Sequence, residues 1–374
     1  MDLLELRDKI DVIDKQMVEL YEQRMDICKQ VAQYKIETGK KVFDRVREEE
    51  KIRKVKSYTN DEFYSRAVEE LFEQIMSVSR KLQYRLLAEH GSLGRLPFMG
   101  VDTLHEDKLR VVFQGAEGAY SQAAMMQYFG NEIDSFHVDT FRDAMSAIEE
   151  GSADFAVLPI ENSTAGIVSD IYDLLVEFEN YIVGEQIIKI EHCLLGLPGT
   201  KLEDIKTVYS HPQSLMQSAR FLNEYNWQQI SMQNNAFAAK KVIEDKDKTQ
   251  AAVASAYAGE IYGLEVLKQG VNQSETNATR FIIVTNQKVF LKDAKKISIC
   301  FEIPHESGSL YRLLSHFIYN NLNLCKIESR PIEGRNWEYR FFVDIEGNLA
   351  DSAVKNALRG LRDEARNMKI LGNY

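Results

Sequence analysis

Residues 2–38 read DLLELRDKIDVIDKQMVELYEQRMDICKQVAQYKIET, and their apolar spacing decides the fold of the N-terminal part. Apolar residues recur there at steps of three and four, at Leu3, Leu6, Ile10, Ile13, Met17, Leu20, Ile27, Val31 and Tyr34. This period predicts a single amphipathic helix from Asp2 to Thr38, about 55 Å long at ~1.5 Å per residue. A region of roughly 90 residues is too small to cover so long a stripe by itself. We therefore expect an intertwined dimer.

The composition of the whole chain excludes several classes of protein. Its 374 residues allow two or three domains, and the net charge of −11 argues against nucleic acid as a partner. No apolar run approaches the ~18–20 residues that cross a bilayer, and the first residues are acidic where a signal peptide is basic. We expect no membrane association and a cytoplasmic location. The four cysteines have no metal-ligand spacing, so we expect no metal and no cofactor.

Polar residues interrupt two apolar stripes that should face each other. The stripe of the first helix predicts an apolar residue at 24, where Arg24 stands, and Lys35 lies in almost the same direction eleven residues on. On a later helical stretch, Ser79 and Gln83 continue a face of apolar residues. Buried charge without a partner is costly, so this pattern predicts an anion site.

The N-terminal region resembles the all-helical chorismate mutases. The matching positions are Arg7, Arg24, Lys35, Asp44, Arg47, Glu48, Ser79 and Gln83. The resemblance implies that guanidinium groups bind the carboxylates of chorismate, that Lys35 and Gln83 aim donors at the breaking ether bond, and that Arg7 comes from the other protomer. The alternative is a helical dimerisation arm with charged residues on its surface.

Short β-branched runs alternate with helical patterns from about Leu109 onward. They include residues 110–113, 154–158, 181–183, 207–209 and 281–284, and they predict an α/β domain with much parallel pairing. The preceding run from Gly91 to Pro97 is typical of a linker. Polar residues lie near the predicted strand ends in three segments. These are Pro159-Ile160-Glu161-Asn162, the segment from Tyr209 to Gln217, and Asn277-Ala278-Thr279-Arg280. Ligands bind at such ends in open α/β sheets.

These motifs together resemble the prephenate dehydratase domain. The resemblance implies two α/β lobes, like the type 2 periplasmic-type binding proteins, with the site in the cleft. It implies that Thr279 donates a hydrogen bond to the departing hydroxyl and that Arg280 anchors a carboxylate. Asn162 and Gln217 are then expected to orient the substrate, with Ser163 and Thr164 assisting. We interpret His211 as structural rather than catalytic, and a His192–Cys193 pair as unlikely to be a site because neighbouring strand side chains face opposite ways.

The last 80 or so residues predict the order strand, helix, strand, strand, helix, which is part of a split β-α-β fold. This pattern and the run Glu328-Ser329-Arg330-Pro331 resemble the ACT regulatory domain, an α+β ferredoxin-like module. The resemblance implies phenylalanine as the effector, bound between two such domains near Gly308, Ser309 and Leu310. The family often has valine where Tyr311 stands, which leaves effector identity and affinity open. A dimerisation module without a ligand is the alternative.

The sequence as a whole is therefore identified as a member of the bifunctional chorismate mutase–prephenate dehydratase family. We expect a helical mutase domain at 1–92, a dehydratase domain at 108–286 and a regulatory ACT domain at 297–374. The substrates would be chorismate and prephenate, with feedback inhibition by phenylalanine. There are two alternatives. The first is a dehydratase whose helical arm serves only as a dimeriser or sensor, and the second is a non-catalytic sensor protein. The sequence leaves three questions open: whether the dehydratase prefers prephenate or arogenate, whether the protein is a homodimer or a homotetramer, and whether prephenate is channelled between the sites.

Overall fold

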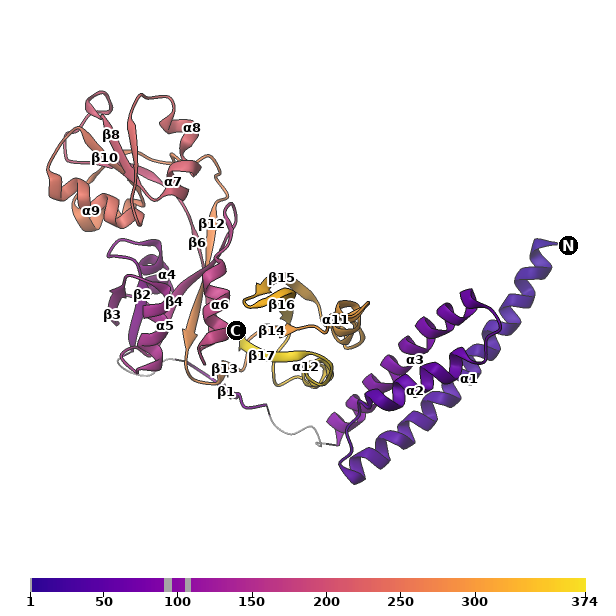
Figure 1. The fold of residues 1–374 in the computed structure, drawn as a ribbon. Coiled ribbons are helices and arrows are strands. Elements are labelled where there is room, and N and C mark those ends of the chain that lie inside the picture. The colour runs from indigo at the N-terminus through magenta and orange to yellow at the C-terminus, as the bar shows by residue number, and fades with distance from the viewer. Residues whose placement is uncertain (1, 91–95, 105–108) are drawn as a thin grey trace. The chain divides into compact units, whose positions relative to one another are not determined.

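The computed structural model describes residues 2–90, 96–104 and 109–374 (Figure 1). It divides into two compact units, of which the first joins residues 1–98 to 292–370 and the second joins residues 99–291 to 371–374. The predicted linker at Gly91–Pro97 lies mostly outside the described residues. The helical segment and the C-terminal segment belong to the same unit, and the division into three domains stays a prediction.

Three helices form the N-terminal part of the first unit: α1 (Leu3–Thr38), α2 (Arg45–Lys56) and α3 (Glu62–Glu89). The bounds of α1 match the prediction. The Asp2 carboxylate caps its start by accepting a hydrogen bond from the Leu4 N–H, and Gly39 ends it with a left-handed φ of 68°. The Asp44 carboxylate caps α2 in the same way by accepting from the Arg47 N–H.

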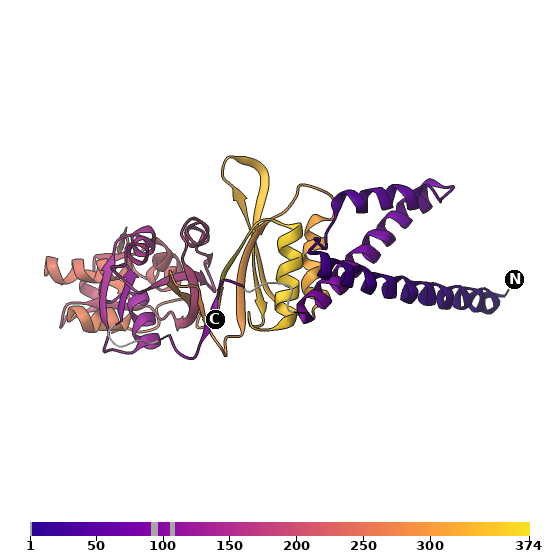
Figure 2. The same ribbon diagram turned by 90° about the horizontal axis from the view of Figure 1, so that it is seen from below.

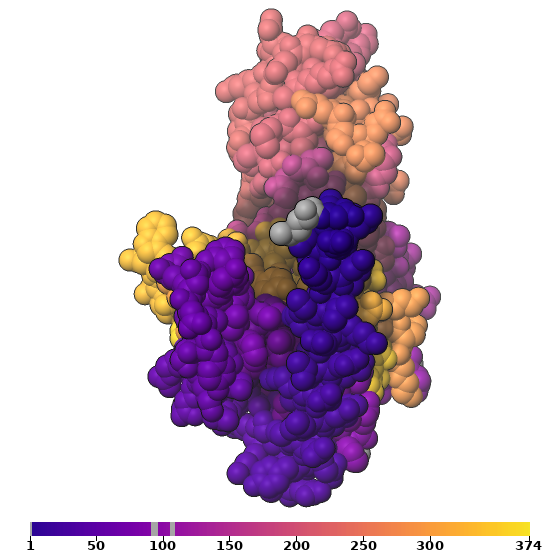
Figure 3. Space-filling view, turned by 90° about the vertical axis from the view of Figure 1, so that its right-hand side faces the viewer, coloured from indigo at the N-terminus to yellow at the C-terminus, as the bar shows by residue number. Residues whose placement is uncertain are grey.

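The apolar stripe of α1 is not covered within the chain. Ala32 is the only residue of α1 that is buried, while Leu20 is 64% exposed. In the space-filling view, the indigo atoms of α1 lie on the surface that faces the viewer (Figure 3). The buried residues of α3 gather instead between Met76 and Leu87 and include Ser79 and Gln83.

The C-terminal segment is a four-stranded sheet with two helices. Its elements in chain order are β14 (Lys296–Glu302), α11 (Ser309–Tyr319), β15 (Leu324–Ile332), β16 (Arg335–Glu346), α12 (Ser352–Glu364) and β17 (Arg366–Asn373). The strand order is β15-β16-β14-β17, and Figure 2 shows both helices on one side of the sheet. The sequence predicted the first five elements and missed β17. Its burial rises along the strand instead of alternating, so it lacks the period-2 pattern.

The second unit contains two α/β lobes. The first lobe has the sheet order β6-β12-β4-β2-β3, with β5 paired to β4. Its elements are β2 (Arg110–Gln114), α4 (Tyr120–Phe129), β3 (Asp134–Val138), α5 (Phe141–Glu149), β4 (Phe155–Asn162), β5 (Gly166–Ile167), α6 (Ser169–Glu177), β6 (Tyr181–Lys189) and β12 (Ala278–Thr285). A small separate pair joins β1 (Met99–Val101) to β13 (Val289–Leu291). Buried Val111, Phe113, Val157 and Phe281 form part of the core of this lobe.

The second lobe lies in the sequence between β6 and β12, so the chain passes between the lobes twice. Its sheet order is β11-β7-β10-β8-β9. Its elements are β7 (Cys193–Gly196), the 3-10 turn η1 (Leu202–Asp204), β8 (Thr207–Ser210), α7 (Pro212–Gln217), α8 (Ala219–Leu222), β9 (Gln228–Ser231), α9 (Asn235–Asp245), β10 (Gln250–Ala254), α10 (Ala256–Tyr262) and β11 (Glu265–Lys268). Two buried clusters, one on each side of this sheet, hold it.

The pairing in both sheets is mixed rather than mainly parallel. β2 pairs in parallel with β3 and β4, but β12 is antiparallel to both β4 and β6. The predicted strand ends also differ, because β4 continues through Asn162 and β12 already begins at Ala278. The polar residues of these two motifs therefore lie on paired strands, and Thr279 stands directly opposite Asn162.

Candidate functional sites

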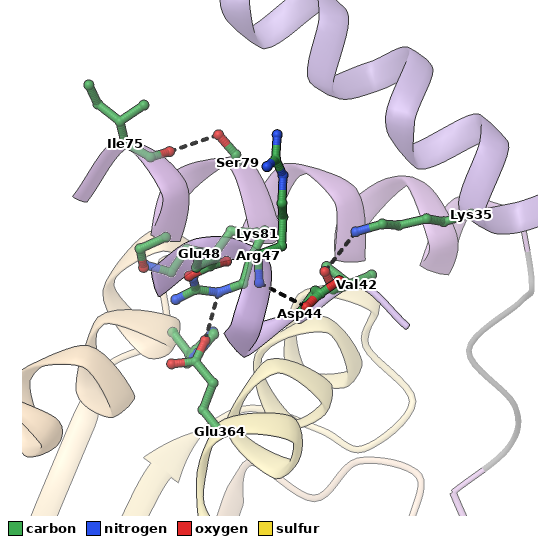
Figure 4. A network of polar contacts seen from close by, with 12 residues as sticks. Lys35, Val42, Asp44, Arg47, Glu48, Ile75, Ser79, Lys81 and Glu364 are labelled. Atoms are coloured by element: carbon green, nitrogen blue, oxygen red, sulfur yellow. Dashed lines mark hydrogen bonds and ion pairs between the residues drawn. The ribbon is translucent and has the colours of Figure 1, made fainter. Parts of the chain in front are cut away.

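Two hydrogen bonds join the polar residues that interrupt the stripes of α1 and α3. Arg24 Nη1 donates to Ser79 Oγ at 2.6 Å, and Lys35 Nζ donates to Gln83 Oε1 at 3.0 Å. Lys35 Nζ also donates to the Val42 carbonyl at 2.7 Å (Figure 4). The structure thus brings together four of the eight residues at the predicted mutase site.

The surroundings of Lys35 are partly buried and acidic. Burial is the main influence on the Lys35 ammonium and lowers its pKa, while the nearby carboxylates of Asp44 and Glu48 act in the opposite direction. Asp44 and Glu48 come from the start of α2, where Asp44 is the capping residue. Six of the predicted mutase residues therefore lie around one place between the three helices.

Arg7 and Arg47 are not part of this cluster in one protomer. Arg7 precedes Arg24 by seventeen residues of the same helix, a separation of about 25 Å at ~1.5 Å per residue. The Arg47 side chain is 72% exposed and forms an ion pair with Glu50 on its own helix. One chain by itself therefore leaves two of the predicted cationic groups away from the others.

Arg80 is a buried residue of this region that sequence reasoning missed. Its guanidinium contacts Glu48 Oε2 at 2.5 Å and Glu364 Oε1 at 3.0 Å. Figure 4 shows Glu48 of α2 and Glu364 of α12 turned toward the same part of α3. No local signal could have found this contact, because Arg80 and Glu364 are 284 residues apart.

Asn162 is the centre of a polar network in the second unit. Its Nδ2 donates to Thr279 Oγ1 at 2.8 Å and to Asn277 Oδ1 at 2.9 Å. Its Oδ1 accepts from Thr164 Oγ1 at 2.8 Å and from the Ala165 N–H at 2.9 Å. This arrangement leaves Thr279 Oγ1 as the acceptor in its contact with Asn162, so the hydroxyl proton of Thr279 is available to another group.

Gln217 reaches the same network from the second lobe. Its Nε2 donates to Thr164 Oγ1 at 2.7 Å, and its Oε1 accepts from Asn277 Nδ2 at 3.1 Å. Ser163 lies between Asn162 and Thr164 in the chain, and its Oγ accepts a hydrogen bond from the Ala278 N–H at 3.0 Å. The structure thus brings five of the six predicted dehydratase residues together, namely Asn162, Ser163, Thr164, Gln217 and Thr279.

His192 forms a hydrogen bond with the Gln217 side chain, and sequence reasoning did not find this role. His192 Nε2 lies 3.0 Å from Gln217 Oε1, and His192 Nδ1 lies 3.2 Å from the Tyr120 hydroxyl. The ring is almost fully buried, and burial lowers its pKa despite the hydrogen bond to Gln217. The imidazole is therefore neutral near pH 7, with Nε2–H donating to the amide oxygen. The expectation that His192 and Cys193 do not act as a pair stays untested.

A cavity of about 440 Å³ lies between the two lobes of this unit and contains Asn162, Gln217, His192 and Thr279 in its wall. None of the described residues that line it is an arginine or a lysine. The N-terminal ends of α4 and α9 reach it through Ala119 and Asn234. α4 has no side-chain cap, and Asn234 Nδ2 has no hydrogen-bond partner among the described residues. Such ends carry partial positive charge and free N–H groups.

Arg280 is not among the residues that line this cavity, and its expected role as a carboxylate anchor stays a prediction. Thr279 and Phe281 line the cavity, so Arg280 points to the other face of β12. There its guanidinium contacts Glu161 at 2.9 Å and Glu185 at 3.5 Å. Because neighbouring side chains of a strand face opposite ways, Arg280 and Thr279 lie on different faces of β12.

The residues predicted to bind an effector lie at two places in the C-terminal segment. Gly308 precedes α11 with a left-handed φ of 73°, Ser309 Oγ donates to the Glu306 carbonyl at 2.7 Å, and Leu310 follows in the first turn. Glu328, Ser329, Arg330 and Pro331 lie on β15, at the end of the sheet order. Tyr311 is exposed, at 56%.

Comparison with known proteins identifies the family. The chorismate mutase type II family profile matches residues 6–84, and the prephenate dehydratase profile matches residues 111–289. The bifunctional chorismate mutase/prephenate dehydratase of Escherichia coli K12 is 33% identical over 382 residues, which cover 100% of this chain and 96% of that protein. The chain belongs to the bifunctional chorismate mutase/prephenate dehydratase family. It is thus an isomerase and a lyase of phenylalanine biosynthesis.

Two further relatives each match about seven tenths of the chain. The chloroplastic arogenate dehydratase/prephenate dehydratase 1 of Arabidopsis thaliana is 38% identical over 72% of this chain and 72% of its own length. The structure of the prephenate dehydratase of Arthrobacter aurescens in complex with L-Phe is 29% identical, covers 71% of this chain and 89% of its own, and has a TM-score of 0.66. Among the described helices, none is both long enough and apolar enough to cross a bilayer.

Proposed function

We propose that the two reactions of this family take place at the two clusters described above. The mutase would occupy the helical segment 1–92, the dehydratase residues 108–286, and a regulatory ACT domain residues 297–374. The mutase residues are Arg7, Arg24, Lys35, Asp44, Arg47, Glu48, Ser79 and Gln83. The dehydratase residues are Asn162, Ser163, Thr164, Gln217 and Thr279. The observation that supports this most strongly is that six of the mutase residues and all five of these dehydratase residues gather in space from separate elements.

The mutase cluster suits a rearrangement that needs no nucleophile and no proton transfer. Lys35 Nζ contacts the oxygen of the Gln83 amide, so the Gln83 Nε2 group is directed elsewhere and can donate. Negative charge grows on the ether oxygen of chorismate as its C–O bond breaks, and donors held in place stabilise it without reorganising. Arg24, already fixed by Ser79, would bind a carboxylate of the substrate.

A second copy of the chain would complete the mutase site. Arg7 lies about 25 Å along α1 from Arg24, and the apolar stripe between them is exposed. A partner helix that covers this stripe would bring its own Arg7 to the cluster. We therefore propose a homodimer in the cytoplasm; a homotetramer would require a second interface through the C-terminal segment.

The dehydratase cluster suits the loss of a hydroxyl group together with carbon dioxide. Because Thr279 Oγ1 accepts a hydrogen bond from Asn162 and Thr279 lines the cavity, its own proton is free to be donated to a substrate group there. Donation to the leaving hydroxyl would polarise the C–O bond, while full proton transfer is unfavourable for so weak an acid. Electrons from the breaking bond to the carboxylate then complete the aromatic ring.

The carboxylates of the dehydratase substrate would be held without a cationic side chain. The cavity contains the uncapped start of α4 and the start of α9, where the Asn234 amide has a free donor. A helix N-terminus binds anions through its free N–H groups and its dipole. The other predicted anchor, Arg280, contacts two glutamates on the other face of β12.

Phenylalanine is the proposed feedback inhibitor. The Arthrobacter prephenate dehydratase was solved in complex with L-Phe. That protein aligns with 71% of this chain, which is more than the residues 111–289 that the dehydratase profile matches. The proposed binding residues are Gly308, Ser309, Leu310, Glu328, Ser329, Arg330 and Pro331. They lie at the start of α11 and on β15, so a second copy of the segment would have to bring the two sets together.

Prephenate is the proposed substrate of the dehydratase because the mutase region supplies it. The Arabidopsis relative is named for both arogenate and prephenate, so both compounds belong in the assay. A kcat/KM for arogenate equal to or above that for prephenate would contradict the preference.

Two substitutions in the full chain test the assignment of the sites. Lys35→Ala is expected to reduce chorismate mutase kcat by about 100-fold or more, since it removes a donor at the breaking bond. Thr279→Ala is expected to do the same to the dehydratase, whereas Thr279→Ser, which keeps the hydroxyl, should retain most of it. Each variant should leave the other activity within about twofold. Full dehydratase activity in Thr279→Ala would refute the role of this hydroxyl.

A further inference from the structure

Arg80 follows the proposed mutase residue Ser79 in the chain, but its side chain contacts other groups. Its side chain is 5% exposed, and its only carboxylate contacts among the described residues are Glu48 on α2 and Glu364 on α12. Its guanidinium also lies 5.1 Å from the centre of the Phe43 ring. A buried guanidinium therefore stands between a proposed mutase carboxylate and a carboxylate of the C-terminal segment.

The geometry of this group links the positions of the two carboxylates. Guanidinium is planar and rigid, so an oxygen bound at Nη1 and another bound at Nε have fixed directions relative to each other. Burial by itself would raise the pKa of Glu364, but the hydrogen bond with His316 and the charge of Arg80 hold it below its ordinary value. Glu364 is thus held in the ionised form that pairs with Arg80.

Glu364 is itself firmly held on its own side. His316 Nε2 on α11 lies 3.1 Å from Glu364 Oε1, and both side chains are buried. Gly360 permits this packing, because a Cβ at that position would lie 2.4 Å from the His316 ring. The position of Glu364 is therefore determined by α11 and α12 together rather than by a flexible side chain.

Neighbouring contacts keep α3 against these two helices. Lys81 Nζ donates to Ser315 Oγ at 2.9 Å, and the Tyr84 hydroxyl donates to Asp363 Oδ2 at 2.6 Å. A second ion pair, Arg45–Glu306 at 3.0 Å, is exposed on both sides and so contributes little. The buried contact through Arg80 is consequently the one that can determine where Glu48 lies.

We propose that Arg80 is a positioning residue of the mutase site, and that Glu364 of the C-terminal segment sets the position of Glu48 through it. This inference rests on the proposed role of Glu48 in the mutase. The mutase site then depends on a carboxylate outside the helical segment, whereas the dehydratase cluster of the other unit does not.

The test is the kinetics of the full-length Glu364→Gln protein. This change keeps the size and a hydrogen-bonding oxygen but removes the charge that fixes Arg80. A misplacement on the order of 1 Å at a catalytic group can cost 100-fold, so mutase kcat/KM is expected to fall by about 10-fold or more. Dehydratase kcat/KM should stay within about twofold. Glu306→Gln, which breaks the exposed pair, is the matched control and should leave both activities within about twofold.

Arg80 itself provides a second pair of variants. Arg80→Lys keeps the charge without the planar fork, and Arg80→Met removes both, so mutase kcat/KM should decrease from wild type to lysine to methionine. A Glu364→Gln protein with mutase activity within twofold of wild type would overturn the proposal. So would an equal loss of both activities, which indicates general damage. A wild-type protein that does not convert chorismate would instead refute the proposed mutase function.

Discussion

At the scale of single residues, the direction of each hydrogen bond decides what the dehydratase cluster can do. Asn162 donates to Thr279 and accepts from Thr164 and Gln217, so each amide in the network has a defined orientation. His192 fixes the last member, because its Nε2–H specifies which end of the Gln217 amide is the oxygen. The Gln217 NH2 group is thereby turned toward Thr164, and Gln217 itself lines the cavity between the lobes.

This chain of contacts predicts a pH dependence for the dehydratase. Burial lowers the pKa of His192, so the ring is neutral above about pH 6.5, the ordinary value, and gains a proton only at lower pH. Stability from the neutral ring is fully present above that value and is lost as the pH falls toward the lower pKa of the folded state. We expect His192→Gln to lower dehydratase kcat/KM by about 10-fold and to change the acid side of its pH profile.

Variants of two other histidines test whether the acid side of the dehydratase pH profile is due to His192. His211 also lines the cavity and also has its pKa lowered by burial, so His211→Gln must be measured beside it. His137 on β3 is exposed and lies outside the lining, which makes His137→Gln the neutral control. An acid limb that is unchanged in His192→Gln and lost in His211→Gln would refute the role of His192.

The sequence predicted these residues unequally, for physical reasons. Arg24 and Ser79, like Lys35 and Gln83, were found because a charged or polar residue breaks a regular apolar stripe. Arg280 and Thr279 are adjacent in their motif but face opposite sides of the strand, which a motif does not reveal. His192 was passed over because its partners Tyr120 and Gln217 are 72 and 25 residues away.

At the scale of elements, the apolar stripe of α1 is exposed rather than packed within the chain. Ile10, Ile13, Met17 and Leu20 are each more than half exposed, and large contiguous apolar surfaces mark interaction sites. The period of this stripe is that of helices that pack along their length. A stable dimer through α1 is the expected consequence.

A single charge within the stripe tests this dimer. Met17→Glu is expected to convert the dimer to a monomer in sedimentation velocity, since burying an unpaired carboxylate is costly. Mutase activity should fall by about 10-fold or more because the partner's arginine is lost, and dehydratase activity should largely remain. Gln16→Glu adds the same charge at the adjacent exposed position and should leave the dimer intact. A Met17→Glu protein that stays dimeric would show that α1 is not the interface.

The contact of α3 with α11 predicts a second pH effect. Burial lowers the pKa of Lys81 to about 7, although Ser77, Ser315 and the Tyr319 ring surround the ammonium. Between pH 7 and about 10.4 the unfolded chain binds this proton more strongly, so wild-type stability rises with pH, by at most about 1.4 kcal/mol per pH unit. Lys81→Met should therefore stabilise the protein more at pH 6 than at pH 9, as read from the difference in Tm.

Lys54→Met, at an exposed position of α2, is the control for this measurement and should shift Tm equally at both pH values. A constant difference between Lys81→Met and wild type from pH 6 to pH 9 would mean that Lys81 keeps an ordinary pKa in the folded protein.

Helix bounds were better predicted from the sequence than strand pairing. The periodic pattern predicts α1 to within one residue at its start, and the structure shows Asp2 and Gly39 as its capping residues. Strand pairing depends on partners far away in the chain, so the antiparallel position of β12 between β4 and β6 was not predicted. The bound of β4 was also missed, since Pro159-Ile160-Glu161-Asn162 resembles a turn but continues the strand.

At the scale of the whole molecule, the chain combines two successive reactions with a C-terminal segment that contacts the mutase helices. The family profiles cover most of the first 289 residues, and the E. coli relative aligns with the whole chain. The division into two compact units was not predicted, because it depends on side chains such as Arg80, Tyr84 and Asp363 from the two ends of the sequence. Both reactions and their proposed inhibition can be followed in one solution.

The most direct test of this account is a coupled assay of the purified protein, in which chorismate loss and phenylpyruvate formation are followed together, with and without phenylalanine. The account predicts that chorismate alone yields phenylpyruvate without any added enzyme, and that millimolar phenylalanine suppresses its formation. Prephenate consumed while chorismate is untouched would contradict the mutase assignment. Phenylpyruvate formed at an unchanged rate in phenylalanine would contradict the regulatory role of the C-terminal segment.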